Sequence, residues 1–353
     1  MLSHEAVPAL DSWYLDHLGC VYDRSSLRLE DGGLISNAGK RYPVVDTIPV
    51  MLRDDVPATL QTATASLRRA KGEISGDPRL PEFYLETLGV DDAERAGIVE
   101  LAAKGSSVDP VVSYLVGATN GIMYRHLRGN LNRYPIPPFP RPPGKGELLL
   151  DIGCGWGRWC FSAANAGYSV VGIDPSLGAV SAGRRVAAQL GKQVRFVVGD
   201  ARHLPFHDAC FDRVYSYSVI QHFSREDAHR TALEIGRVLK PGGNAAVQMP
   251  NRLGIRCLYH QARRRFREGT GFEVRYWSLG SLRSLFEQAV GPCRFEVDCF
   301  FGIGLQSADA DLMPTPFRIL MKTSDSVRAA SRVLAPLRWI ADSVFVIMQK
   351  PHA

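Results

Sequence analysis

The stretch LLLDIGCGWGRWC, residues 148–160, begins as an apolar run that ends in an acid and continues with glycines at alternate positions. The apolar run predicts a buried strand, and the glycines predict a turn into a helix. In a dinucleotide-binding turn the spacing is G-x-G-x-x-G, and the third glycine lets the helix pack closely beneath a pyrophosphate. Here the order is Gly153-x-Gly155-x-Gly157. Arg158 occupies the place of that third glycine, so the spacing argues against a pyrophosphate site.

Acidic residues end three consecutive predicted strands of the segment after residue 147. Strand-like and helix-like stretches alternate there, which predicts a parallel sheet with helices on both faces. The acids are Asp151, Asp174 and Asp200. Ligands of an open α/β sheet bind at the carboxyl ends of its strands, where an acid about 20 residues beyond the first turn accepts bonds from ribose hydroxyls. We expect Asp174 to bind a ribose, Asp200 to accept the exocyclic amine of adenine, and Asp151 to receive an ammonium or amide donor.

Five segments carry a family resemblance, and their order along the chain is LLLDIGCGWG, VVGIDPS, GDARHLPF, FDRVYSYSVIQHF and EIGRVLKPGG. They resemble the successive motifs of class I methyltransferases of the ubiquinone-biosynthesis type, which depend on S-adenosyl-L-methionine (SAM). The resemblance covers roughly residues 147–250. It implies an α/β fold with a Rossmann-like seven-stranded sheet, completed by a strand pair near the end of the chain, and it implies SAM as the cofactor.

The resemblance also implies a set of cofactor contacts. Asp151 and the glycine turn are expected at the methionine end of SAM, Asp174 at the ribose, and Asp200 with Ala201 at the adenine. Tyr124 precedes the first predicted strand, in a region that similar enzymes fold over the cofactor. It is a candidate contact for the cofactor carboxylate, and a plain surface helix is the alternative. The full expected set is Tyr124, Asp151, Gly153, Cys154, Gly155, Trp156, Gly157, Asp174, Pro175, Asp200, Ala201 and Ser218.

Candidate catalytic residues lie just past the fourth predicted strand. Methyl transfer from a sulfonium is an in-line displacement in which alignment of the reactants contributes roughly 7 to 11 kcal/mol. His222 is the first candidate base, because an ordinary histidine pKa of about 6.5 suits proton removal near neutrality. An equally supported interpretation is that His222 packs or caps the chain there. Tyr217 is a further candidate that is equally well explained as core, and His260 is another.

Candidate substrate contacts include an arginine-rich stretch after the fifth predicted strand, residues 251–277. Guanidinium groups suit phosphate or carboxylate, although a solvated helix face is the commoner origin of such a run. The substrate candidates are Gln221, Arg256 and Tyr259. These features predict O- or N-methylation of a small-molecule biosynthetic intermediate, with sugars, glycolipids and other anionic metabolites among the expected substrates.

The N-terminal part predicts a separate small β module. Its stretch RYPVVDTIPVML is similar to the zinc-ribbon subunit that partners certain tRNA and release-factor methyltransferases. Only Cys20 matches a metal ligand of that subunit, while Asp23, Ser36 and Gly39 stand at the other ligand positions. A thiolate cage cannot be built from one thiol, so we expect a degenerate ribbon without metal.

Composition shifts divide the chain into four expected parts. The predicted domains are a zinc-ribbon-like module at 1–55, a helical lid at 56–134, a proline-rich linker at 135–146 and a methyltransferase domain at 147–353 with a helical insertion at about 306–342. The insertion alternates apolar and basic positions at helical intervals. We expect it to pack against the sheet, with covering the pocket, docking a partner or lying on a membrane surface as alternatives.

Composition also limits the classes of protein. No run approaches the roughly 20 apolar residues that cross a bilayer, and the start MLSHEAVPALDSW carries acids where a secretory signal carries cations. We therefore expect a cytoplasmic protein without integral membrane contact. The seven cysteines form no C-x-x-C pair, which argues against a disulfide framework and a zinc site. Nothing in the sequence predicts the oligomeric state.

Two other functions stay open. SVIQHFS is also similar to a family that modifies wobble uridines, which makes a tRNA methyltransferase the enzyme alternative. RNA binding usually needs a larger basic excess than the formal charge of +6 found here, so nucleic acid is the less favoured partner. The second alternative is a non-catalytic binding or scaffold protein that keeps the fold. The three intact strand-end acids argue against it.

Overall fold

A seven-stranded sheet forms the centre of the computed structural model, which describes residues 10–352 except 59, 75, 78–79 and 303. The order of its strands is β11-β12-β10-β9-β6-β7-β8. The strands are β6 (Leu148–Ile152), β7 (Ser169–Asp174), β8 (Val194–Val198), β9 (Phe211–Ser216), β10 (Leu239–Pro250), β11 (Cys293–Cys299) and β12 (Ser343–Gln349). Strands β6 to β10 pair in parallel, while β12 is antiparallel to both β10 and β11. This sheet confirms the predicted α/β fold class. Residues 1–9, which belong to the stretch in which the sequence predicts no secretory signal, lie outside the described residues.

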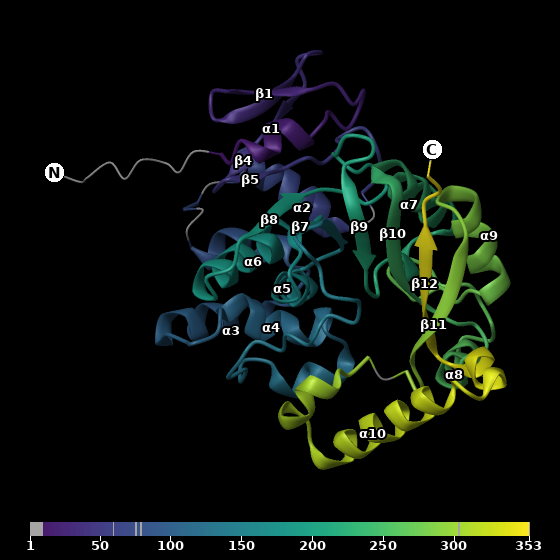
Figure 1. Cartoon of the computed structure of the whole chain (residues 1–353). Coiled ribbons are helices and arrows are strands. Elements are labelled where there is room, and N and C mark those ends of the chain that lie inside the picture. The colour runs from purple at the N-terminus through teal and green to yellow at the C-terminus, as the bar shows by residue number, and fades with distance from the viewer. Residues whose placement is uncertain (1–9, 59, 75, 78–79, 303, 353) are drawn as a thin grey trace.

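Helices cover both faces of the sheet (Figure 1). They are α5 (Arg158–Asn165), α6 (Leu177–Gln189), α7 (Arg225–Val238) and α9 (Leu279–Ala289). Helix α8 (Ile255–Arg263) follows β10 and lies at the end of the molecule near α10 (Figure 1). Successive residues of a strand point to opposite faces, so Leu149 joins the core under α5 and α6 while Leu150 joins the core under α7 and α9. Helix α7 begins as its sequence predicts, because the Ser224 hydroxyl accepts a bond from the Asp227 amide at 3.0 Å.

The N-terminal residues form a small β module at one edge of the sheet. Its elements are α1 (Trp13–His17), β1 (Leu27–Glu30), β2 (Gly33–Ser36), β3 (Arg41–Tyr42), β4 (Val44–Val45) and β5 (Ile48–Pro49). The strand β8 would otherwise be an open edge, but Val50 pairs with Val198 and the Met51 amide donates to the Val198 carbonyl at 2.7 Å. The Tyr14 hydroxyl adds a bond to the Phe196 carbonyl at 3.0 Å. The module therefore covers a free sheet edge.

The residues aligned with metal ligands in that module make ordinary hydrogen bonds. The Cys20 sulfur lies 3.1 Å from the Tyr42 hydroxyl, and Asp23 accepts bonds from Ser25. The Ser36 hydroxyl accepts the Lys40 amide at 3.1 Å. Across the described part of the chain, no group of three or more His, Cys, Asp or Glu residues is arranged to hold a metal ion. The resemblance to a zinc ribbon remains a prediction.

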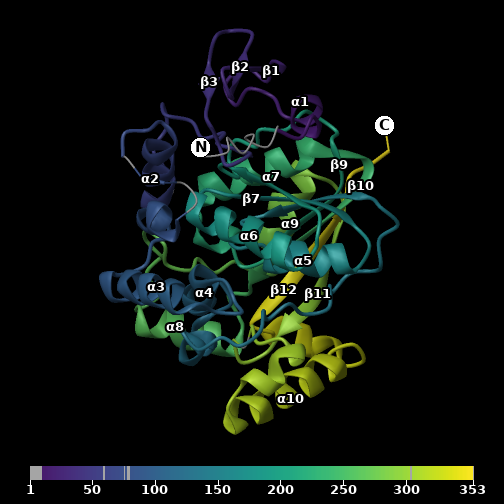
Figure 2. The ribbon, with the colours of Figure 1, turned by 90° about the vertical axis from the view of Figure 1, so that its left-hand side faces the viewer.

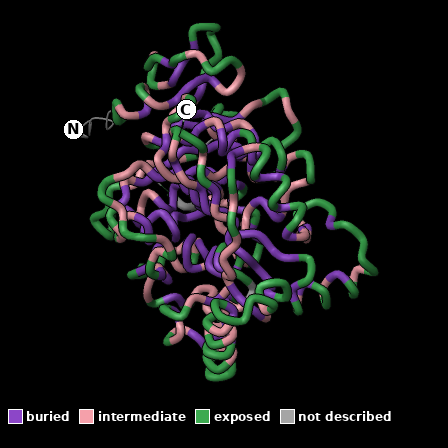
Figure 3. The backbone as a smooth tube through the Cα atoms, turned by 45° about the vertical axis from the view of Figure 1, so that its right-hand side comes forward, coloured by how far each residue is buried: buried purple, intermediate pink, exposed green. Residues whose placement is uncertain are grey.

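Helical segments complete the molecule. Those before the sheet are α2 (Gln61–Ala70), η1 (Pro81–Thr87), α3 (Asp92–Lys104), α4 (Pro110–Thr119) and η2 (Ile122–Leu127), with η3 (Ile220–His222) after β9. The proline-rich residues 135–146 contain neither helix nor strand, as predicted. They lie on α5, because the carbonyls of Pro135 and Pro137 accept bonds from Arg158 and Ser162. Figure 3 shows the buried residues concentrated in the middle of the molecule.

The segment between β11 and β12 is helical, with η4 (Ser307–Leu312), α10 (Thr315–Ala330) and η5 (Ala335–Ile340). It packs on the margin of the sheet, where α10 contacts the edge strand β11, and the rest of this helix lies along one end of the molecule (Figures 1 and 2). The expectation that the insertion packs against the sheet therefore holds only at this margin. The buried residues of α10 are Met321 and Ser324, and the Ser324 hydroxyl bonds to the Phe300 carbonyl at 3.1 Å. Among the described helices, none has the length and apolar character that a bilayer crossing requires.

Candidate functional site

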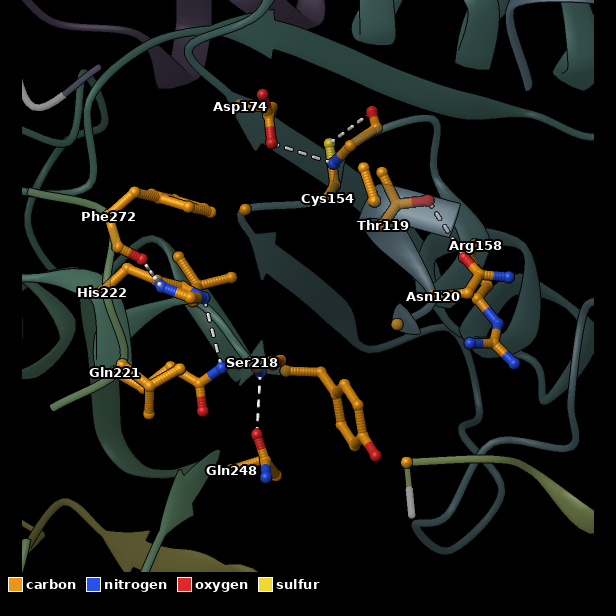
Figure 4. Close-up of a pocket in the computed structure, with 18 of the residues that line it drawn as sticks. Thr119, Asn120, Cys154, Arg158, Asp174, Ser218, Gln221, His222, Gln248 and Phe272 are labelled. Atoms are coloured by element: carbon orange, nitrogen blue, oxygen red, sulfur yellow. Dashed lines mark hydrogen bonds between the residues drawn. The ribbon is translucent and has the colours of Figure 1, made fainter. Parts of the chain in front are cut away.

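A cavity of about 810 Å³ lies at the carboxyl ends of the sheet strands. Residues at or just after the ends of β6, β7, β8 and β9 form one wall, and residues of α8, β11 and β12 form another. The predicted cofactor residues that line it are Gly153, Cys154, Gly155, Trp156, Asp174, Pro175, Asp200, Ala201 and Ser218. The predicted catalytic and substrate residues that line it are Tyr217, Gln221, His222, Arg256 and His260. Figure 4 shows ten residues of this lining labelled.

The alternating glycines are required by the backbone between β6 and α5. Gly153, Gly155 and Gly157 have φ angles of 72°, 54° and 87°, a left-handed region that residues with a side chain rarely adopt. A Cβ at Gly153 would also lie 2.3 Å from a methyl carbon of Val219. Gly157 departs from the expectation, because it caps α5 and faces Phe161 outside the cavity lining.

Asp174 is placed to accept hydroxyl donors from a ligand. One carboxylate oxygen accepts the Gly155 amide at 3.0 Å, and the other accepts the Ser176 amide at 2.9 Å. Each oxygen therefore keeps one lone pair free of these backbone bonds. Enclosure in the cavity wall raises the pKa of Asp174 to about 6, against the lowering effect of the two amides. The glycine turn and Asp174 thus form one hydrogen-bonded unit (Figure 4).

Asp151 does not take the role that the sequence predicted. It is fully buried on β6, it does not line the cavity, and its carboxylate accepts a bond from the Cys160 thiol at 3.2 Å. Burial raises the pKa of Asp151 to about 7. A carboxylate sealed beneath the glycine turn cannot receive an ammonium group from a ligand. The Asp151 carboxyl is better explained as part of the protein core beneath the glycine turn.

Asp200 lines the cavity, but another residue already occupies its carboxylate. Arg202 donates from its amide, its Nε and its Nη2, at distances between 2.6 and 3.1 Å. These are three N–H donors, with the Nε–H shared between both oxygens, so they occupy most of the roughly four lone-pair positions of the carboxylate. Arg202 in turn donates to Asp227 and to the Pro57 carbonyl. The contact between Asp200 and an adenine amine stays a prediction: Asp200 lines the cavity and is paired there with Arg202.

Tyr124 also lies outside the cavity lining, in a buried polar cluster behind it. Its hydroxyl donates to Asp309 at 2.6 Å and accepts Arg158 at 3.0 Å, while Arg158 pairs with Asp309 at 2.7 Å. Burial raises the pKa of Tyr124 to about 12. Arg158 reaches the cavity lining, whereas the predicted contact from Tyr124 to the cofactor carboxylate is wrong because the hydroxyl is held by Asp309.

Asn120, at the end of α4, is a cavity residue that the sequence analysis missed. Its side-chain carbonyl accepts the Thr119 hydroxyl at 3.0 Å, and Thr119 also accepts the Trp156 indole N–H at 3.2 Å. The Asn120 side-chain NH₂ is buried and has no hydrogen-bond partner among the described residues, although the residue is only 7% exposed. A buried donor without a partner costs free energy, so this group is suited to an acceptor on a ligand.

His222 faces the cavity with a defined orientation. Its Nδ1 lies 2.7 Å from the Phe272 carbonyl, and its ring stacks on the Phe272 ring with centroids 3.9 Å apart. A carbonyl only accepts, so Nδ1 carries the proton and Nε2 keeps its lone pair, 3.2 Å from the Gln221 amide nitrogen. Burial lowers the pKa of His222 below its ordinary value. The neutral form, which can take a proton, is thus favoured.

The backbone next to His222 is strained. Ser218 has a φ of 62°, which is uncommon for a residue with a side chain, and its amide donates to the Gln248 side chain at 2.9 Å. Gln221 donates to the Ser218 hydroxyl at 2.6 Å. Gln248, on β10, was not singled out in the sequence, where a glutamine in an apolar strand gives no signal. This network holds the chain after β9 against the cavity (Figure 4).

Tyr217 and Asp298 meet at the other wall. The Tyr217 hydroxyl donates to the Asp298 carboxylate at 3.3 Å, and the Ser343 hydroxyl donates to the same oxygen at 2.7 Å. Burial raises the pKa of both Tyr217 and Asp298. A phenol with a raised pKa stays protonated near neutrality, so Tyr217 serves as a donor and a wall. Asp298 lines the cavity and was missed by the sequence analysis.

Helix α8 brings a cation to the same part of the cavity. Arg256 and His260 line it, and Arg256 Nε donates to His260 Nε2 at 3.3 Å. Burial is the main cause that lowers the pKa of His260, and the positive charge of Arg256 is the second cause. Arg256 forms no ion pair with any acid in the described part of the chain. The predicted substrate contact from Tyr259 is not supported, because this residue lies on the outer side of α8 and is 57% exposed.

Comparison with known proteins identifies one domain. Residues 149–243 match the family described as a methyltransferase domain. O-methyltransferase resE of Aspergillus sclerotiorum is 37% identical over 107 residues, which are 29% of this chain and 39% of that protein. Demethylmenaquinone methyltransferase of Corynebacterium kroppenstedtii is 32% identical over 145 residues, which are 41% of this chain and 56% of that protein. A solved SAM-dependent methyltransferase from Methanosarcina mazei is 21% identical with a TM-score of 0.42, covering 60% of this chain and 95% of that one.

The matched region bears out part of the family resemblance seen in the sequence. It contains the glycine turn, the strands β6 to β9 and most of the cavity wall that they form. This chain spans 39% of one curated relative and 56% of the other. The N-terminal module, the helical segment before the sheet and the insertion after β11 lie outside the matched residues.

Proposed function

We propose that this protein is a SAM-dependent methyltransferase that methylates an oxygen or nitrogen nucleophile of a small molecule. The observation that carries the proposal is the hydrogen-bonded unit of Asp174 and the glycine turn, set at the strand ends of a matched methyltransferase domain. Ligands bind at this edge of an α/β sheet. The names of the curated relatives, which include O-methyltransferases, support an oxygen nucleophile.

The chain's own residues fit SAM. The free lone pairs of Asp174 suit two ribose hydroxyls, which are donors. The unpartnered NH₂ of Asn120 suits the carboxylate of the methionine portion, and it replaces Tyr124 as our candidate for that contact. Gly155 keeps the turn close to Thr119, because a Cβ there would lie only 3.3 Å from the Thr119 side chain. A ligand with a diol and a carboxylate would therefore complete groups that the structure leaves unsatisfied.

His222 is the proposed base for a protonated nucleophile. When bound, SAM supplies an electrophilic methyl group. The nucleophile must lose its proton, and His222 Nε2 is the neutral lone pair that faces the cavity. The Phe272 carbonyl holds the Nδ1 proton and so stabilises the imidazolium that forms. The Gln221 amide donates a hydrogen bond to His222 Nε2 until a substrate hydroxyl takes its place. Gln221 is therefore a positioning residue.

The α8 part of the cavity is the proposed substrate site. Arg256 is a cation without an acidic partner in the described residues, so a carboxylate or phosphate on the substrate would pair with it. Asp298 and Tyr217 supply an acceptor and a donor nearby. Residues of the helical segment before the sheet, from Leu60 to Met123, line the cavity as well, and we infer that this segment acts as a lid.

Calorimetry with SAM tests the proposal directly. We expect one SAM per chain, binding of S-adenosylhomocysteine at the same site, and no binding of NAD, because the turn lacks the third glycine that admits a pyrophosphate. An Asn120→Leu variant should weaken SAM binding, since it removes the donor for the carboxylate and keeps a similar volume. A wild-type protein that binds NAD in place of SAM, or neither, would overturn the proposal.

A further inference from the structure

Helix α8 has its apolar side on the outside of the molecule. Cys257 and Gln261, spaced by four residues, are the buried positions of the helix. The exposed positions Ile255, Leu258 and Tyr259, with Ala262, follow the spacing i, i+3, i+4, i+7 of a single helical face. A helix at the surface of a globular protein normally reverses this pattern. The outward apolar stripe is therefore a face without a partner in this chain.

A neighbouring segment extends this apolar face. The Asn251 side chain donates to the carbonyls of Trp339 at 2.7 Å and Ala341 at 2.9 Å, which joins the start of α8 to the end of η5. Figure 1 shows both elements at the same end of the molecule. We call this surface the α8–η5 face, and its exposed apolar members are Leu253, Ile255, Leu258, Tyr259, Trp339 and Ile340. Val333, which is 86% exposed, adjoins it through Arg338, whose guanidinium bonds to the Ser331 and Arg332 carbonyls.

Positive charge surrounds the α8–η5 face. Residues 251–267 and 326–341 contain no aspartate or glutamate. Six arginines of these two stretches form no ion pair with any acid of the described residues. Arg256 faces the cavity, and the other five are Arg252, Arg263, Arg265, Arg332 and Arg338. Unpaired guanidinium groups around an exposed apolar surface are complementary to an anionic, partly apolar partner.

We propose that the α8–η5 face docks on an anionic lipid bilayer surface. A helix that presents apolar residues on one side with arginines beside them binds the headgroup region of a membrane, and tryptophan is favoured at that depth. A second copy of this chain is a poor occupant, because a two-fold interface would bring the five unpaired arginines against their own copies. A nucleic acid is a poor occupant as well, since bases stack on aromatic rings and this face is mainly aliphatic.

Docking would also place the cavity beside the bilayer. The opposite side of α8 presents Arg256, Cys257 and His260 to the cavity. One helix thus separates the proposed docking surface from the proposed substrate site. The docking proposal stands on the exposed residues alone, and it does not depend on the methyltransferase activity.

Vesicle co-sedimentation of the full chain tests the proposal. We expect the protein to sediment with vesicles of equal parts phosphatidylcholine and phosphatidylglycerol, and to sediment far less with phosphatidylcholine alone. Raising the salt concentration should weaken binding, because the arginine contribution is screened. The double variant L258E/W339E should lower the partition coefficient about tenfold or more, because it replaces apolar contact by like-sign repulsion. The double variant R263E/R265E should weaken binding to the anionic vesicles.

Leu29→Glu is the matched control. Leu29 is 48% exposed on β1, in the N-terminal module at the opposite end of the molecule (Figure 1), so its replacement should leave vesicle binding unchanged. Thermal unfolding and SAM calorimetry verify that each variant is folded. Equal partition of wild type and L258E/W339E, or no partition of wild type into either vesicle, would overturn the proposal. A wild-type dimer that L258E/W339E dissociates, with no vesicle binding, would instead assign the face to a second copy.

Discussion

The two walls of the cavity are built in different ways. In the strand-end wall, the groups that face the cavity are fixed by backbone amides of the turns after neighbouring strands, as Asp174 is by Gly155 and Ser176. In the α8 wall they come from elements far apart along the chain, as Arg256, Asp298 and Ser343 do. The first wall lies within the matched methyltransferase domain, and α8, β11 and β12 of the second lie outside it.

His222 stands where the two walls meet, and removing its base function should have the largest effect. We expect His222→Gln to lower kcat by about 10²- to 10⁴-fold, the range typical of general bases, with little change in SAM affinity. Single-turnover methyl transfer and calorimetry measure the two quantities. His229→Gln, which changes an exposed histidine of α7, is the matched control. A kcat within threefold of wild type would show that the nucleophile needs no base here, or that Asp298 supplies it.

Within the strand-end wall, Asp174→Ala should have the next largest effect. The variant removes both free acceptors for the ribose, and bonds to a charged group contribute about 1.5 to 3 kcal/mol, so SAM affinity should fall about 100-fold. Calorimetry measures the change. Asp151→Asn is the comparison variant. Asp151 is also an aspartate at a strand end, but its side chain is buried in the core. We expect Asp151→Asn to change the thermal stability of the protein more than its affinity for SAM. A larger change in SAM affinity would support the sequence prediction that Asp151 contacts the methionine end of SAM.

The strand-end wall is also the part that the sequence could predict. The glycine spacing marks positive φ angles, and the acid at the end of β7 lies beside that turn because the two parallel strands are neighbours. Sequence position alone does not show which way a side chain points. Asp151 and Asp200 end their strands as expected, yet one faces the core and the other is held by Arg202. Both outcomes depend on packing partners that have no fixed spacing from the acid.

Only part of the α8 wall, namely Arg256 and His260, was predicted from the sequence, for a related reason. Asp298 and Tyr217 are brought together by tertiary structure, and so are Asn120 and the glycine turn. A single acid in a strand or an asparagine at a helix end gives no signal of its own. The arginine run did point to α8, but periodicity could not tell that Arg256 faces the cavity while Tyr259 faces solvent.

Arg256→Gln should produce a smaller effect that is confined to the substrate. Loss of one charge-assisted pair corresponds to about a 20-fold rise in KM for an acidic substrate, with SAM affinity preserved. Steady-state kinetics with matched acidic and neutral substrates separates the two walls, since the neutral substrate should be nearly unaffected. Arg230→Gln, an exposed arginine of α7, is the control. An equal effect on both substrates would mean that Arg256 maintains the cavity and does not recognise charge.

The smallest expected effect is a dependence of SAM affinity on pH that belongs to the strand-end wall. Burial raises the pKa of Asp174 to about 6 in the free protein, so the carboxylate that we propose as the acceptor of the ribose hydroxyls is formed above that pH and lost below it. Affinity should therefore fall as the pH drops, by about tenfold between pH 7.5 and pH 5. Calorimetry at several pH values measures this change. Asp151, whose pKa burial raises to about 7, titrates in the same range. Asp174→Asn distinguishes the two: the dependence should vanish in that variant if Asp174 causes it, and persist if the buried Asp151 does.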